Sequence, residues 1–168
     1  RLGRTDTDQD PLGYRTLFML ELASRYYDVP DLADRILDPD QIYPETALIS
    51  QFEVGAIDAA LAYRNMAVER DYDYVELPPE INLSDPAYAD DWYATTAYTL
   101  PSGKRVTGGL IRYASTIRHL RDPVLRVFAE QCTGAYRTQF GLTVPDGYPR
   151  FHGSVPTRVA TAPGLRSA

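Results

Sequence analysis

Residues 8–15 read DQDPLGYR, and they begin the first strong helix signal of the chain. Asp10 stands where an N-cap carboxylate is favoured, and Pro11 fills the first helical position, where its missing N–H costs nothing. Apolar residues at helical spacing follow as far as Tyr27. The stretch therefore predicts a carboxylate beside the free amides of a helix N-terminus, a place suited to binding anions. The alternative is that Asp10 only caps its own helix.

Beyond this helix the pattern alternates between helical segments and short apolar runs. We expect helices over residues 32–37, 44–55 and 122–141, strands over 57–63, 74–77, 92–100 and 105–115, a hairpin loop at 101–104 and a connection over 80–91. The tail from Pro145 is interpreted as loop with a last short strand. Gly108 and Gly109 indicate a bulge or close packing. Helices alternating with short buried strands predict an α/β protein.

Composition narrows the class of protein. The 168 residues, 44% of them hydrophobic, fit one ordinary domain or two small lobes with a real core. The aliphatic and aromatic content excludes a disordered chain, and no apolar run approaches the roughly 18–20 residues that span a bilayer. The formal net charge of -6 argues against nucleic acid as a partner, because phosphate backbones require a basic surface.

Familiar catalytic and metal-binding signatures are absent from the sequence. It holds two histidines and one cysteine, and it has no CxxC, HExxH, phosphate-loop, GxSxG or dinucleotide motif. What remains are polar residues at the ends of expected elements. Glu80 follows two prolines that stiffen the backbone, and Tyr63 ends a buried strand, where open α/β sheets bind ligands. The alternatives are a solvated surface Glu80 and, for Tyr98, a place in the core.

Three motifs carry a family resemblance: residues 8–15, residues 53–67 (EVGAIDAALAYRNMA) and residues 74–84 (YVELPPEINLS). In this order they resemble the molybdate/tungstate-binding proteins of ABC importers, above all the tungstate-binding type found mainly in archaea. The likeness continues through residues 93–98 and the Thr107 strand to the last helix. It therefore covers nearly the whole chain.

The resemblance implies a type II periplasmic-binding-protein fold, in which two α/β lobes joined by a hinge close on an oxyanion. Residues 1–90 would form most of the second lobe, and residues 91–168 the returning segment that completes the first lobe. Family members are about twice as long and begin with a signal peptide or lipid anchor. On this interpretation the N-terminal part of the first lobe is missing here.

The resemblance also implies the site residues. Two carboxylates, Asp10 and Glu80, would bind the metal atom of the oxyanion itself and raise it from four to six oxygen neighbours. The hydrogen-bond donors to the anion would be the hydroxyl of Tyr98 and the amides of Leu12 and of Ala62 or Tyr63. Sulfur in sulfate accepts no such extra ligands, so we expect a preference for tungstate and molybdate.

The function implied is that of a binding module, not an enzyme, with no cofactor. It would capture tungstate or molybdate outside the cytoplasm, in the periplasm or lipid-anchored at the cell surface, and deliver it as a monomer to an ABC permease. Two alternatives stay open. One is a glycosidase-like hydrolase that uses Asp10 and Glu80 as an acid–base pair. The other is a cytoplasmic oxyanion sensor domain with the same fold.

Overall fold

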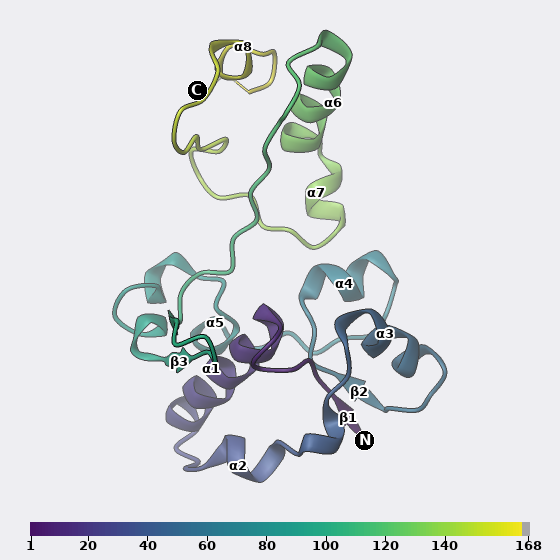
Figure 1. Cartoon of the computed structure of the whole chain (residues 1–168), viewed down its shortest axis with the longest axis vertical. Helices are drawn as coiled ribbons and strands as arrows, with labels where there is room; N and C mark the ends of the chain where they lie inside the picture. The colour runs from purple at the N-terminus through teal and green to yellow at the C-terminus, as the bar shows by residue number, and fades with distance from the viewer. Residues whose placement is uncertain (166–168) are drawn as a thin grey trace. The chain divides into compact units, whose positions relative to one another are not determined.

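The computed structural model describes residues 1–165, which form two compact units. Unit 1 consists of residues 1–63 and 74–112, and unit 2 of residues 64–73 and the chain from 113 onward. The elements, labelled in part in Figure 1, are β1 (Leu2–Gly3), α1 (Pro11–Tyr26), α2 (Leu32–Ile36), α3 (Glu45–Glu53), β2 (Ala59–Ala60), α4 (Arg64–Glu69), α5 (Pro79–Asn82), β3 (Ala97–Thr99), β4 (Arg105–Thr107), α6 (Asp122–Thr133), α7 (Tyr136–Gln139) and α8 (Thr157–Ala160). This mixture of helices and strands confirms the α/β class.

In unit 1 a short parallel pair of strands leads into α1. β1 pairs with β2 in the register Leu2↔Ala59 and Gly3↔Ala60. The amide of Leu61 then donates to the carbonyl of Gly3 at 2.9 Å. Because the two strands are parallel, their C-terminal ends lie side by side. The segment from β1 to α1 and the segment from β2 to Tyr63 therefore start from the same end of the pair.

The core of unit 1 lies under α1. Phe18 and Leu22, one turn apart on the helix, are buried with Leu83 and Tyr93. β3 and β4 form an antiparallel hairpin whose turn spans residues 100–104. A Cβ on Gly108 would lie 2.2 Å from the carbonyl oxygen of Tyr93, so the close packing predicted there is confirmed.

Unit 2 is built around α6. Ala129 and Cys132 of that helix pack against Val159 and Ala162 of the α8 region, and Figure 1 shows α6 and α8 side by side. In the same unit the guanidinium of Arg64 donates to the carbonyl of Gly141 at 2.8 and 3.0 Å. This bond ties α4 to the segment that follows α7.

Two expected helical features are corrected. The helix predicted over residues 122–141 breaks at Gly134, whose backbone is extended (φ -61°, ψ 143°), so it becomes α6 and α7. Glycine in a helix interior is costly, which explains the break. The connection predicted over residues 80–91 contains the short helix α5, because Pro79 occupies its first turn instead of only ending a strand.

The expected strands are mostly too long. The structure has strand at Ala59–Ala60 within residues 57–63, at Ala97–Thr99 within residues 92–100, and at Arg105–Thr107 within residues 105–115. Residues 74–77 are not strand. A strand exists only where a neighbour supplies hydrogen bonds, and β1 offers two paired residues. The last short strand expected in the tail is instead the helix α8. None of the helices in residues 1–165 has the length and apolar character needed to cross a membrane.

Candidate functional site

The loop between β1 and α1 is folded against the first turn of α1. Within it, Asp6 accepts hydrogen bonds from the amide of Asp8 at 2.8 Å and from the side chain of Gln9 at 3.0 Å, and its carbonyl accepts the amide of Asp10 at 3.0 Å. A Cβ on Gly13 would lie 2.2 Å from that same carbonyl oxygen of Asp6. The absence of a side chain at Gly13 is therefore what lets the loop lie on the helix.

Asp10 caps α1. Its Oδ1 accepts the amide N–H of Leu12 at 2.6 Å, and its backbone is extended, as an N-cap requires. Two of the predicted site groups, the Asp10 carboxylate and the Leu12 amide, are thus bonded to each other. Within residues 1–165 no hydrogen-bond donor contacts the second oxygen, Oδ2. The capping alternative holds for one oxygen of Asp10, and the other is free for a ligand.

Tyr98 reaches the same loop from β3. Its hydroxyl donates to Oδ1 of Asp8 at 2.7 Å, across 90 positions of sequence. This hydrogen bond is the main cause that raises the pKa of Tyr98, because ionising the phenol would place its charge against the carboxylate. The structure therefore brings Tyr98 to the Asp6–Asp10 loop, with Asp8 as its partner.

Tyr63 lies three residues after β2 and is bonded to α1. Arg15 donates to the Tyr63 hydroxyl, and its guanidinium carbon lies 5.7 Å from the centre of the Tyr63 ring and 5.9 Å from that of Tyr14. Burial is the main cause that raises the pKa of Tyr63. Ala62 beside it is exposed. Arg15 is a residue of this site that the sequence reasoning missed, although it closes the DQDPLGYR motif.

Glu80 is held by a different set of contacts. It lies in the first turn of α5, where its Oε1 accepts the hydroxyl of Tyr88 at 2.9 Å. The indole of Trp92 donates to the Glu80 carbonyl at 2.7 Å, and the hydroxyl of Tyr93 donates to the carbonyl of Pro79. In the described part of the chain no hydrogen bond joins Glu80 to Asp10 or Tyr98. The α5 turn is therefore anchored by aromatic side chains rather than by the other predicted site residues.

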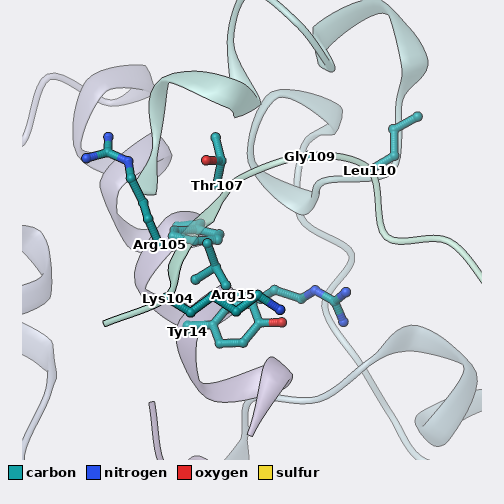
Figure 2. A pocket seen from close by; sticks show the side chains of 9 residues that line it. Tyr14, Arg15, Lys104, Arg105, Thr107, Gly109 and Leu110 are labelled. Atoms are coloured by element: carbon teal, nitrogen blue, oxygen red, sulfur yellow. The ribbon is translucent and has the colours of Figure 1, made fainter. Parts of the chain in front are cut away.

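A basic hollow of about 260 Å³ lies between α1 and the β3–β4 hairpin. Its lining includes three cationic side chains: Arg15, Lys104 and Arg105. Figure 2 shows that the guanidinium groups of Arg15 and Arg105 extend to opposite sides, so the charges of these two arginines do not converge on one point. None of the predicted site residues lines this hollow. Among residues 1–165 no group of three or more His, Cys, Asp or Glu side chains is placed to hold a metal ion.

Comparison with known proteins finds relatives that are similar to most of the chain. No family model matches the chain. The chain is 53% identical over 157 residues, 92% of its length, to a protein of Haloferax volcanii named "Putative ABC transporter molybdenum-binding protein". It is 35% identical over 166 residues, 90% of its length, to an "Uncharacterized solute-binding protein" of Halobacterium salinarum. It is 30% identical over 151 residues, 76% of its length, to "Molybdate/tungstate-binding protein WtpA" of Pyrococcus abyssi.

The matched regions cover 51%, 50% and 43% of these three proteins. The chain thus spans about half the length of the curated relatives it matches.

Proposed function

The chain is a relative of the molybdate/tungstate-binding solute-binding proteins, as its three motifs predict, and from this premise we propose that it is an oxyanion-binding module of an ABC importer. It captures molybdate or tungstate reversibly and delivers the anion to a membrane permease. The module carries out no chemistry and has no cofactor, since the oxyanion is cargo. It works outside the cytoplasm as a monomer.

One observation carries the proposal. Tyr98, a predicted hydroxyl donor, lies against the Asp6–Asp10 loop, which also presents Oδ2 of Asp10. Two predicted site residues 88 positions apart therefore share one loop. The parallel β1–β2 pair sends the Tyr63 segment out from the same edge as this loop, which supports the backbone of Ala62 and Tyr63 as a further source of donors.

The charge of the site suggests which anions it accepts. A carboxylate facing a dianion repels it unless its oxygen bonds to the central atom. Asp10 and Glu80 would do so only with a large hexavalent centre such as Mo or W. Sulfate would meet the repulsion without gaining the bonds. We therefore propose selectivity for molybdate and tungstate over sulfate.

The finer architecture of the family is part of the same proposal. A type II periplasmic-binding-protein fold has two lobes that close by a hinge on the anion. Residues 1–90 would supply most of the second lobe and residues 91–168 the segment returning to the first.

Thermal unfolding of the 168-residue chain with each anion tests the function. A ligand at 100 times its Kd stabilises a folded protein by about 2.7 kcal/mol, which raises Tm measurably. We expect molybdate and tungstate to raise Tm and equal concentrations of sulfate to leave it unchanged. No shift with any of the three anions would refute binding by this chain, and equal shifts with all three would refute the selectivity.

A further inference from the structure

Arg15 holds an unusual position next to the candidate site. It lies five residues after the N-cap Asp10, in the second turn of α1, and its guanidinium is partly buried between the rings of Tyr14 and Tyr63. Its one hydrogen bond in the described residues goes to the Tyr63 hydroxyl. A cation over aromatic faces is held by the negative face of each ring, which keeps the guanidinium in place.

The partners of Arg15 leave its charge uncompensated. Within residues 1–165 no carboxylate lies within ion-pair distance of it, although Asp6, Asp8 and Asp10 occupy the adjoining loop. Arg25 on the same helix shows the contrast, since it forms an ion pair with Glu21. Tyrosines position the Arg15 cation without neutralising it, so its field remains available to an anion nearby.

Tyr63 connects this cation to the candidate binding segment. It follows Ala62 directly. Burial is the main cause that raises the pKa of the Tyr63 phenol, and the charge of the Asp10 carboxylate adds a smaller contribution in the same direction. The bond from Arg15 fixes the Tyr63 side chain on α1 and with it the end of the segment that leaves β2. The same contact therefore positions the backbone after β2 and holds a positive charge in the second turn of the helix that Asp10 caps.

We propose that Arg15 is a positioning and charge-compensating residue of the oxyanion site. Through Tyr63 it orients the chain after β2, and its unpaired charge offsets the repulsion between the Asp10 carboxylate and a tetrahedral dianion. This inference rests on the proposed function and assigns a role to a residue outside the predicted ligand set. Arg105 of the β3–β4 hairpin is not assigned this role, because its guanidinium extends away from Arg15 (Figure 2).

Calorimetric titration of the 168-residue chain with sodium molybdate tests this role. Arg15→Gln removes the charge, Arg15→Lys keeps it, and Arg25→Gln is the matched control because it removes one charge from the same helix. We expect Arg15→Gln to weaken binding by about tenfold or more and to reduce its dependence on salt, while Arg15→Lys recovers most of the affinity. Arg25→Gln should bind as the wild type does.

The outcomes separate the two proposals. Wild-type chain that binds no molybdate overturns the proposed function, and the role of Arg15 with it. Wild-type binding combined with equal affinities for Arg15→Gln and Arg25→Gln overturns the role of Arg15 alone. A loss of affinity as large in Arg15→Lys as in Arg15→Gln overturns the charge compensation.

A second variant tests the positioning role of Arg15 if Arg15→Gln does not fold. Tyr63→Phe keeps the ring and removes the hydroxyl acceptor of Arg15. We expect it to weaken molybdate binding at least threefold with an unchanged circular dichroism spectrum. Unchanged affinity in Tyr63→Phe would overturn the positioning role.

Discussion

Two carboxylates with the same expected role, Asp10 and Glu80, are held in opposite ways. Asp10 is fixed by backbone: its Oδ1 binds an amide two residues away, and the loop around it is closed by the Asp6 carbonyl. Glu80 is fixed by a side chain, the hydroxyl of Tyr88, on a four-residue helix that aromatic residues anchor. The first region is therefore held by hydrogen bonds between near neighbours in the sequence, and the second by hydrogen bonds from aromatic side chains further along the chain.

The largest effect is expected from displacing the Asp6–Asp10 loop from α1. Gly13→Ala places a methyl group 2.2 Å from the Asp6 carbonyl oxygen, so loop or helix must move. Overpacking of this kind costs about 1–3 kcal/mol, and we expect that loss in the free energy of unfolding measured with urea. Gly109→Ala is the control, because nothing lies within 4 Å of the added carbon. Equal stability of the two variants would show that the loop is not packed on the helix.

Substitution of Asp10 and of Glu80 separates the role of each carboxylate in stability from its role in binding. Asp10→Ala removes a cap and should cost about 1 kcal/mol, whereas Asp10→Asn keeps a good capping residue and should cost little. Both remove the charge, so both should weaken molybdate binding in calorimetric titrations.

Glu80→Ala should weaken binding as well, while changing stability by less than Asp10→Ala does. The exposed Glu45→Ala is the control for both sites. If Asp10→Asn binds molybdate like Glu45→Ala, the carboxylate of Asp10 is no ligand.

The smallest effect concerns the two phenols that face carboxylates, Tyr98 on Asp8 and Tyr88 on Glu80. In both, the hydrogen bond to the carboxylate is the main cause that raises the pKa above its ordinary value of 10.0. A raised pKa means that the contribution to stability is present below pH 10 and is lost as pH rises through the folded-state pKa.

Absorbance at alkaline pH measures this effect. We expect Tyr98→Phe and Tyr88→Phe each to remove one phenol that ionises late, with no change in the titration of the remaining tyrosines. Removal of a phenol that ionises at or below pH 10 would contradict the hydrogen bond in question.

The contrast also explains what could be predicted from the sequence. The cap at Asp10 and the start of α1 were predictable because the residues responsible are adjacent, and the resemblance to molybdate/tungstate-binding proteins was carried by contiguous motifs. The break at Gly134 had a local signal too, since glycine interrupts helices. Features that depend on neighbouring residues could thus be predicted from the sequence.

The partners across the fold were not predictable. Nothing in the residues around Glu80 indicates that Tyr88 and Trp92 fold back onto it, and the pairing of Arg15 with Tyr63 joins positions 48 apart. The Tyr98 hydroxyl donates to Asp8 rather than to Asp10, which lies two residues further along the same loop. Such pairings depend on loop geometry, which the periodicity of the sequence does not predict.

Lys104, in the turn of the β3–β4 hairpin, has a practical consequence. It is the only lysine in these 168 residues, its side chain is exposed, and it lines the hollow beside Tyr14 and Arg15. An amine-reactive fluorophore would therefore mark one side chain of these 168 residues, on the hairpin that also carries Tyr98, together with the α-amino group of Arg1. A dye on Lys104 would allow anion capture to be followed by fluorescence from the hairpin itself.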